Sequence, residues 1–434
     1  MNTLWRWIVM IACVLALTLS AAAQSTWVVT DANGAQHNVY IQHVDRTVLG
    51  KDVVHYRYDV TVGPGKFDRI RLHRVVREKH PWQPIHTVTG LLMLGGLPNS
   101  VEMIFIEPLI SPAAAWDHAI TVFLAKKNID VWAMDYRWAL VPAKTKNFKF
   151  MKEWGLERDV DDAQIALSLA RMIRGVTGQG FGKMHLLGFS YGVQVAYPVA
   201  NQETQLPRSL RNVKGLIPVD DAITYPSDHP FHIAACDLIP QLQAVLDGGV
   251  YNEDNSGVKQ IGDLARSAPD DPSPFADGFT NYQFALFAGA SGDPQQLYWH
   301  FVGGIFNEAG ITTGLQYTDP WLWIDVLRAV PPYNPVRIDL EYNKVYCYDV
   351  MAPFDDHLGE ITLPILYVGS GGGTGEGGYY AVTRTASTDT TKFIVQLHPD
   401  DERALDFGHV DLFAAKHAKT LVWQPILDWL VAHR

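Results

Sequence analysis

The sequence predicts an α/β fold in which a mostly parallel sheet is flanked by helices. From residue 87 onward, short apolar runs alternate with longer segments of helical periodicity, which is typical of parallel strands joined by crossover helices. Residues 26–78 are instead strand-like, with apolar and polar side chains alternating at 53–62 and 67–76, which indicates an extra N-terminal β segment. The 434 residues, 47% of them hydrophobic, suffice for one large domain with an insertion or for two domains.

The elements follow one another in a regular order. Gly63-Pro64-Gly65 separates two strand-like stretches and predicts a hairpin. Buried strands are then expected at residues 91–94, 130–137, 183–187, 213–220, 363–368 and 392–397, with helices at 116–126, 160–173 and 420–432. Residues 24–220 and 356–434 would together form the α/β core.

The regular alternation of predicted strands and helices stops between residues 221 and 355. This stretch is rich in proline, glycine and aromatic residues, among them Trp299, Phe301, Trp321 and Trp323. We expect it to form a largely helical cap or lid inserted above the sheet. Its aromatic side chains would belong either to the core of the cap or to the wall of an apolar pocket.

The first residues are typical of a secretory signal peptide. Arg6 supplies positive charge, residues 8–17 are apolar, and Ala23 ends a run of small residues. We expect cleavage after Ala23 and a secreted or periplasmic protein with no integral membrane span in the mature chain. An uncleaved anchor is the alternative, although the apolar stretch is short for a span.

Charge and cysteine content exclude some classes of protein. The net charge is −11 and no long basic run is present, which argues against a nucleic-acid partner. Two cysteines follow the predicted signal, Cys236 and Cys347. An exported compartment permits a disulfide between them, but two free buried thiols are equally compatible with the sequence. No spacing of cysteine and histidine predicts a metal site.

Gly188-Phe189-Ser190-Tyr191-Gly192 has the pattern Gly-x-Ser-x-Gly between a strand-like and a helix-like run. At such a junction the glycines allow a sharp turn that holds the serine in a strained conformation. Ser190 is therefore the candidate nucleophile. A serine hydroxyl needs a base to accept its proton and an acid to orient that base.

The candidate base is His409, which lies in a loop between the last predicted strand and the final helix. Gly408 before it would let the ring approach Ser190. His398, His417 and His433 lie in the same C-terminal region, but their positions fit the base less well.

The candidate acid is Glu376, the carboxylate of the glycine-rich loop that follows the strand at residues 363–368. Asp220 or Asp221, at the end of the preceding strand, are the alternatives. For the oxyanion hole we expect the backbone N–H groups of Leu97 and Tyr191, since Gly95 and Gly96 permit close approach of the first turn.

These motifs in this order resemble the α/β-hydrolase superfamily. The resemblance rests on the turn at Gly95-Gly96-Leu97-Pro98, the strand end Asp135-Tyr136-Arg137, the Ser190 elbow and Gly408-His409. Gly95 stands where histidine is common, and Trp138 where glycine is usual. An aspartate nearer the strand would be usual for the acid. The resemblance implies an eight-stranded sheet, a cap, and no metal or organic cofactor.

The expected function is hydrolysis of carboxylic esters by a Ser190–His409–acid triad through an acyl-enzyme. The aromatic insertion favours a small or lipid-like ester with an apolar portion, as for an esterase or lipase. An amidase or peptidase with the same triad is one alternative. A binding protein that has the fold without catalysis is another.

Overall fold

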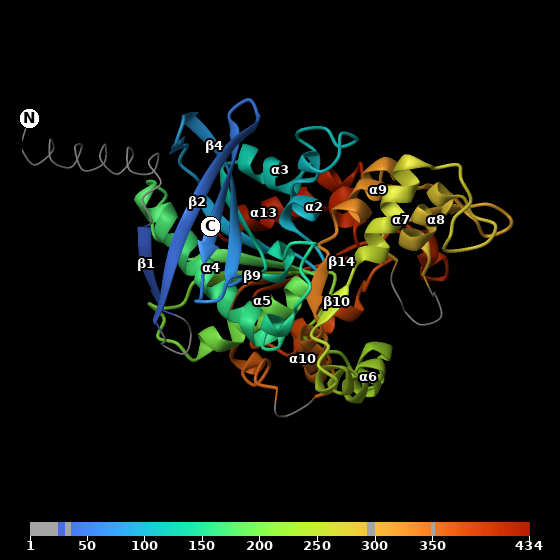
Figure 1. Ribbon diagram of the computed structural model, residues 1–434. Coiled ribbons are helices and arrows are strands. Elements are labelled where there is room, and N and C mark those ends of the chain that lie inside the picture. The colour runs from blue at the N-terminus through green and yellow to red at the C-terminus, as the bar shows by residue number, and fades with distance from the viewer. Residues whose placement is uncertain (1–24, 31–35, 293–299, 349–351) are drawn as a thin grey trace, which may run out of the picture.

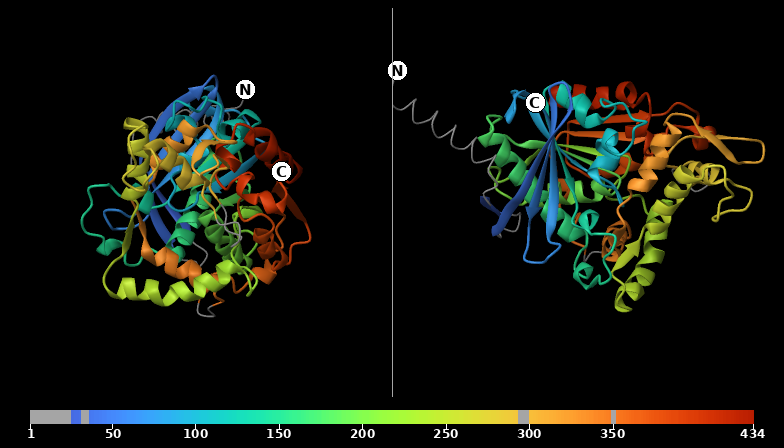
Figure 2. Two further views of the ribbon diagram at one scale, coloured as in Figure 1. Left: turned by 90° about the vertical axis from the view of Figure 1, so that its right-hand side faces the viewer. Right: turned by 45° about the horizontal axis from the view of Figure 1, so that its top comes forward.

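A single twisted sheet forms the centre of the molecule (Figure 1). The computed structural model describes residues 25–30, 36–292, 300–348 and 352–434, so the predicted signal peptide lies outside the described residues. The sheet has eleven strands in the order β1-β2-β3-β4-β7-β6-β8-β9-β14-β15, with β5 paired to β4. The strands fan out strongly when seen along the sheet (Figure 2).

The strands of the sheet have the following bounds: Ser25–Thr30 (β1), Gln36–Gly50 (β2), Val53–Thr61 (β3), Arg69–His80 (β4), Gln83–Pro84 (β5), Thr89–Leu94 (β6), Ile129–Asp135 (β7), Met184–Phe189 (β8), Val213–Val219 (β9), Ile365–Ser370 (β14) and Thr390–Val395 (β15). A strand is present at every position expected from residue 91 onward, although β15 is exposed over its first half and not buried as expected. The hairpin at Gly63-Pro64-Gly65 joins β3 to β4.

The sheet is larger than the eight strands that the family resemblance implies. Strands β7, β6, β8, β9, β14 and β15 are parallel. The N-terminal segment continues the sheet by antiparallel pairing, with residues of β4 opposite residues of β7 from Arg71↔Asp135 to Val75↔Val131. The extra β segment is therefore a part of the central sheet.

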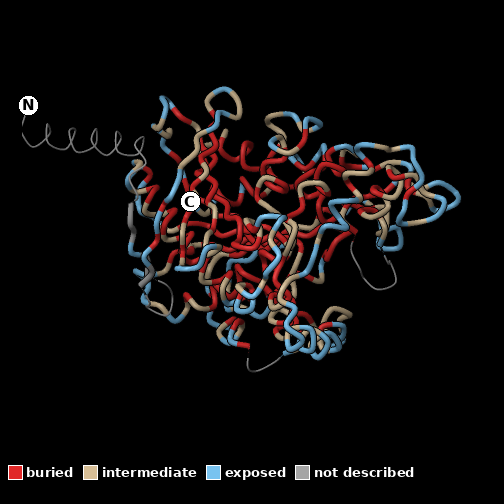
Figure 3. The backbone as a smooth tube through the Cα atoms, viewed as in Figure 1, coloured by how far each residue is buried: buried red, intermediate tan, exposed pale blue. Residues whose placement is uncertain are grey.

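Two hydrophobic cores lie on the two faces of the sheet. Successive residues of β6 alternate between them: Leu92 and Leu94 join one core, Leu91 and Met93 the other. Because both faces are covered, β6, β7 and β8 are buried along their whole length. The red interior in Figure 3 is this pair of cores.

Helices cover both faces of the sheet. The first core contains residues of Leu156–Val176 (α4), Tyr191–Thr204 (α5) and Tyr380–Thr383 (α11). The second contains residues of Val101–Phe105 (α2), Ile120–Lys126 (α3), Asp411–Ala414 (α12) and Gln424–Ala432 (α13). A π-helical turn, Lys419–Trp423, precedes α13, so the predicted last helix is present with an irregular first turn.

The segment between β9 and β14, where we expected a cap, divides between the two faces. Its helices are Pro230–Asp247 (α6), Ser256–Ser267 (α7), Asn281–Ala290 (α8), Pro320–Ala329 (α9) and Val336–Tyr346 (α10), and its short strands are Asn252–Asp254 (β10), Gly304–Phe306 (β11), Thr312–Leu315 (β12) and Tyr333–Pro335 (β13). Helix α10 packs on the first core, whereas α7, α8 and α9 contribute to the second.

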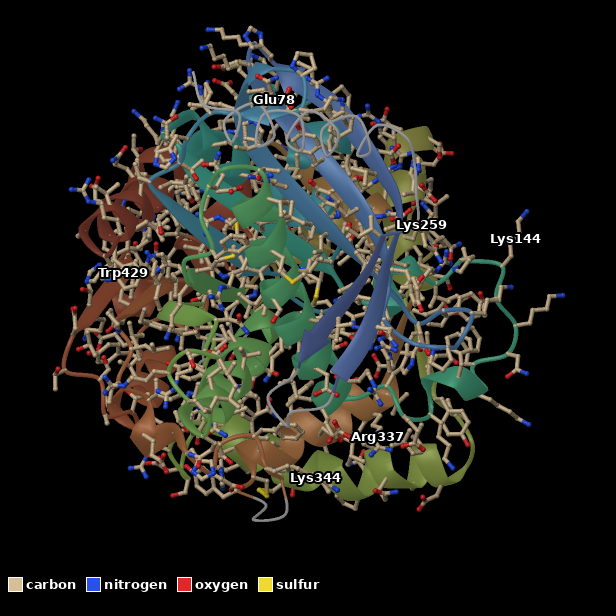
Figure 4. All side chains as sticks on the ribbon, turned by 90° about the vertical axis from the view of Figure 1, so that its left-hand side faces the viewer. Glu78, Lys144, Lys259, Arg337, Lys344 and Trp429 are labelled. Carbon is tan, nitrogen blue, oxygen red and sulfur yellow. A yellow bond between two sulfur atoms is a disulfide. The ribbon has the colours of Figure 1, made fainter. Side chains whose placement is uncertain are left out.

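Helix α10 is tied to the body of the molecule by an ion pair. Arg337 bonds Glu153 at 2.8 Å, and Glu341 of the same helix bonds Arg337 at 2.6 Å. Arg337 and Lys344 mark this helix near the bottom of Figure 4, with α6 running beneath it. A disulfide between Cys236 and Cys347 links α6 to the end of α10. The structure thus decides the pairing that the sequence left open.

Helix α6 is mostly exposed (Figure 3). Ala235 is its buried residue, while the large apolar side chains of Ile233, Leu238 and Val245 are exposed. The helix therefore contacts the rest of the chain along a narrow stripe.

Candidate active site

Ser190 lies at the turn between β8 and α5 in a strained backbone conformation. Its φ and ψ are 53° and −127°, a region that residues with a side chain rarely adopt. The turn is fixed from both sides, because Ser190 N–H donates to Val219 O at 3.1 Å and Val193 N–H donates to Ser190 O at 2.7 Å. The predicted strand–turn–helix setting of Ser190 is confirmed.

The glycines around Ser190 are required by close contacts. A Cβ on Gly188 would lie 2.2 Å from Gly192 O, and one on Gly192 would lie 2.2 Å from Leu94 O. A Cβ on Gly96 would lie 2.9 Å from Ser190 Cβ. The turn after β6, which contains Gly96, therefore packs closely against the turn at Ser190. Such close approach of the two backbones requires glycine, which has no Cβ.

His409 is held beside this turn. Its side chain is 3% exposed, and its Nδ1 lies 2.7 Å from Asp220 Oδ2. The ring stacks on Phe189, the residue before Ser190, at 4.4 Å between centroids. Gly408 allows the approach, because a Cβ there would lie 2.6 Å from Phe301 O.

The Asp220 carboxylate is buried among five donors. Its Oδ1 accepts from Ser370 N–H, Thr374 N–H and the Thr374 hydroxyl, and its Oδ2 accepts from the Ser370 hydroxyl and His409. Burial by itself raises the pKa of Asp220, but the hydrogen bonds with His409 and Ser370 outweigh it and lower the pKa below its ordinary value. Asp220 is thus an anion that orients the His409 ring.

Glu376, the first candidate for the acid, lies elsewhere, and Asp220, one of the two alternatives, is the carboxylate beside His409. The Glu376 side chain is 73% exposed and forms an ion pair with Lys392 at 2.8 Å. The glycine-rich loop instead surrounds Asp220, since a Cβ on Gly373 would lie 1.9 Å from Asp220 Oδ2. The glycines make room for an acid from the neighbouring strand rather than carrying one of their own.

Asp411 supports the histidine loop, a role that sequence reasoning missed. Its Oδ2 accepts from Gly408 N–H and Gly303 N–H, both at 2.8 Å. Its Oδ1 accepts from the Thr318 hydroxyl at 2.6 Å. Burial raises the pKa of Asp411 to about 6. An acidic residue two positions after the candidate base was the available signal.

A pocket of about 430 Å³ opens beside Ser190. Most of its lining is apolar or aromatic, and α6 and α10 supply one wall. The lining residues are Leu97, Ser190, Tyr191, Gln194, Asp220, Asp221, Phe231, Ala234, Ala235, Leu238, Tyr342, Asn343, Tyr346 and His409. The structure thus brings Ser190, His409, Leu97 and Tyr191 together at one cavity.

The aromatic residues of the insertion have different surroundings. Trp323 is buried in the second core, where its indole N–H donates to Ala285 O at 2.8 Å. Phe301 lies at the edge of the His409 ring, with centroids 6.3 Å apart. Trp321 is partly exposed, and Trp299 lies outside the described residues. The pocket wall is instead built from tyrosines of α10 and Phe231 of α6.

The charged side chains of Asp135-Tyr136-Arg137 bond to the surrounding structure. Arg137 is ion-paired with Asp162 at 2.5 Å and with Asp68 at 2.6 Å. Asp135 accepts from Val101 N–H at 2.7 Å. A second hollow of about 530 Å³ lies beside Arg137 and Trp154, and no serine, histidine or cysteine is found among the described residues that line it.

Comparisons with known proteins agree with this architecture. A candidate lipase from Sulfolobus solfataricus superposes with a TM-score of 0.61 at 18% identity, covering 91% of this chain and all of that one. The chain has the α/β-hydrolase fold. No family model and no curated protein matches the sequence.

Two other solved structures are more distant. A soluble variant of monoglyceride lipase from Saccharomyces cerevisiae has a TM-score of 0.47 at 13% identity, covering 85% of this chain and 93% of its own. An esterase from Thermogutta terrifontis has a TM-score of 0.44 at 14% identity, covering 87% and 98%.

Within the α/β-hydrolase fold of this chain, the carboxylate that contacts His409 follows β9 and not β14. Asp220 has a φ of 53° and its N–H donates to Val368 O at 2.7 Å. The bend turns the side chain toward the glycine-rich loop after β14, where an acid was expected. His409 therefore meets its carboxylate in the expected place, although the residue comes from the adjacent strand.

None of the described helices combines the length and the apolar character of a membrane span. Among the described residues, no cluster of three or more histidine, cysteine and acidic side chains is arranged to bind a metal ion.

Proposed function

We propose that this protein is an exported serine hydrolase that cleaves carboxylic esters. One observation carries the proposal: the strained Ser190 and the buried, hydrogen-bonded pair His409–Asp220 line the same pocket. A strained serine next to a histidine that is itself oriented by a carboxylate is the arrangement that acyl transfer requires.

Each residue has a defined part in the proposed reaction. Ser190 Oγ attacks the ester carbonyl while His409 accepts its proton, and Asp220 stabilises the imidazolium that forms. The N–H groups of Leu97 and Tyr191 would bind the oxyanion; Tyr191 is the first residue of α5, where helix N–H groups have no partner within the helix. His409 then protonates the leaving alcohol, and water releases the acyl group by the same steps.

The pocket supports an ester with an apolar portion. Leu97, Phe231 and Leu238 line it together with the tyrosines of α10, and apolar burial is the main source of affinity in such a cavity. The similarity to a candidate lipase concerns the fold and agrees with this choice. Export is proposed from the N-terminal residues, and the Cys236–Cys347 disulfide supports it, because disulfides persist in oxidising compartments.

Hydrolysis assays test the proposal. We expect turnover of p-nitrophenyl esters of short and medium acyl chains, and loss of about 10³-fold or more in kcat/KM for Ser190→Ala and His409→Ala. Faster turnover of peptide anilides than of esters would favour an amidase or peptidase. No turnover of either class by a folded protein would favour a binding protein.

A further inference from the structure

Gln194 presents an unused hydrogen-bond acceptor at the pocket. It lies one helical turn after Ser190 on α5, is 2% exposed, and lines the cavity. Its amide nitrogen donates to Ala222 O at 2.5 Å and to the Tyr346 hydroxyl. These two bonds fix the amide orientation, so the oxygen faces away from both. Among the described residues, no group donates to Gln194 Oε1.

Asp221 presents a second acceptor at the same pocket. Its Oδ1 accepts from Ala222 N–H at 2.7 Å, from the Tyr225 hydroxyl at 2.7 Å and from the Tyr346 hydroxyl at 3.0 Å. No donor from the described part of the chain is bonded to its Oδ2. Because Tyr346 joins the two residues, Gln194 and Asp221 form one connected cluster, which we call the acceptor pair.

The acceptor pair differs from the rest of the pocket. Asp220 already bonds His409 of the proposed triad. Its neighbour Asp221 instead accepts hydrogen bonds from Tyr225 and Tyr346. Gln194 Oε1 is a buried acceptor without a donor from the described residues, which is energetically costly. Asp221 is partly exposed and lines the same pocket. A ligand that offers a donor to Gln194 Oε1 removes the cost there, whereas a purely apolar ligand does not.

We propose that Gln194 and Asp221 form a polar subsite that selects esters carrying a free hydroxyl group near the scissile bond. This inference rests on the proposed ester hydrolysis and adds a substrate class to it. The apolar wall of α6 and α10 accommodates the remainder of the substrate, while the two oxygens accept hydrogen bonds from its hydroxyl groups.

Matched ester pairs test the subsite. Glycerol monobutyrate against propyl butyrate places hydroxyls on the alcohol portion, and p-nitrophenyl 3-hydroxybutyrate against p-nitrophenyl butyrate places one on the acyl portion. We expect the hydroxylated member of at least one pair to have the higher kcat/KM, by about tenfold, since one neutral hydrogen bond has about that effect. The pair that discriminates identifies which portion the subsite contacts.

Asp221→Asn is the sharpest variant. The asparagine keeps an oxygen for Ala222, Tyr225 and Tyr346 but replaces the unused acceptor by a donor. We expect the ratio of kcat/KM within the discriminating pair to fall to near one. Gln194→Met removes the other acceptor and serves if Asp221→Asn does not fold. Leu238→Ala is the control: it lines the apolar wall and should lower both members of a pair equally.

The outcomes separate this inference from the proposed function. Hydrolysis of both members of each pair with equal kcat/KM overturns the subsite and leaves the esterase proposal intact. Equal losses on both members in Asp221→Asn and Gln194→Met also overturn it, because they indicate a purely structural role. If the folded protein hydrolyses no ester at all, both proposals fail together.

Discussion

The surroundings of Asp220 fix its carboxylate in place beside His409. Five donors bind its carboxylate, and one of them is the ring of His409. The Glu376 side chain forms an exposed ion pair with Lys392, and such surface pairs contribute about 0–1 kcal/mol. The two carboxylates therefore differ in burial, partners and proposed role.

We expect Asp220→Asn to lower kcat by about 10³- to 10⁴-fold, because an amide cannot hold His409 in the required tautomer or stabilise its charged form. Glu376→Gln is the matched control and should stay within about twofold of the wild type. Steady-state kinetics on p-nitrophenyl butyrate measures both. Equal activity losses in the two variants would contradict the assignment of the acid.

Asp411 gives a second prediction for a single residue. Asp411→Asn would direct an amide N–H₂ at Gly408 N–H and Gly303 N–H, or else at the Thr318 hydroxyl, so at least one buried donor loses its acceptor. We expect a loss of about 1–3 kcal/mol in the free energy of unfolding and a lower kcat. Urea denaturation and ester kinetics test this, and an unchanged unfolding midpoint would contradict it.

At the scale of elements, the site is assembled where three loops meet. The turn after β8 supplies Ser190, the end of β9 supplies Asp220, and the segment before α12 supplies His409. The glycine-rich loop after β14 encloses the acid. Helices α6 and α10 cover the pocket and are joined by the Cys236–Cys347 disulfide.

The glycine-rich loop predicts a specific defect. In Gly373→Ala the new Cβ would lie 1.9 Å from Asp220 Oδ2, so the loop or the acid must move. We expect lower kcat together with a lower melting temperature. Gly359→Ala is the control, because a Cβ there meets no atom within 4 Å. Wild-type kinetics in Gly373→Ala would show that the loop does not position Asp220.

The disulfide predicts a redox-dependent stability. Cys236 and Cys347 are 111 residues apart in sequence, and closing so long a loop stabilises a fold by about 2–4 kcal/mol. We expect dithiothreitol to lower the urea midpoint of the wild type, and Cys236→Ser to have the lower midpoint with or without reductant. A wild-type midpoint insensitive to reductant, with the thiols shown to be free, would contradict this.

At the scale of the whole molecule, the stability of the fold should report the ionisation of Asp220. The folded state lowers the pKa of Asp220 below its ordinary value of 3.8. Its contribution is therefore present above pH 3.8 and is lost as the pH falls through the lower, folded-state value. The gap in unfolding free energy between wild type and Asp220→Asn should be widest near neutral pH and shrink in acid. A gap that is independent of pH would contradict the ionised carboxylate.

The sequence alone was sufficient to predict the central sheet. It was also sufficient to choose Ser190 and His409, two of the three triad candidates. Periodicity located the parallel strands, and the Ser190 motif and the position of His409 follow from local patterns along one chain. Asp220 could not be chosen over Glu376, because that choice depends on which strand end bends toward the glycine-rich loop. The Gln194–Tyr346 contact spans 152 positions, so the sequence alone offered no sign of it.

Labelling with a fluorophosphonate reagent tests whether Ser190 is the nucleophile. We expect one phosphonyl adduct on the intact protein, mapped by peptide mass spectrometry to the peptide that contains Ser190, and no adduct on Ser190→Ala. An adduct at a different residue, or none on the folded wild-type protein, would contradict a nucleophilic Ser190.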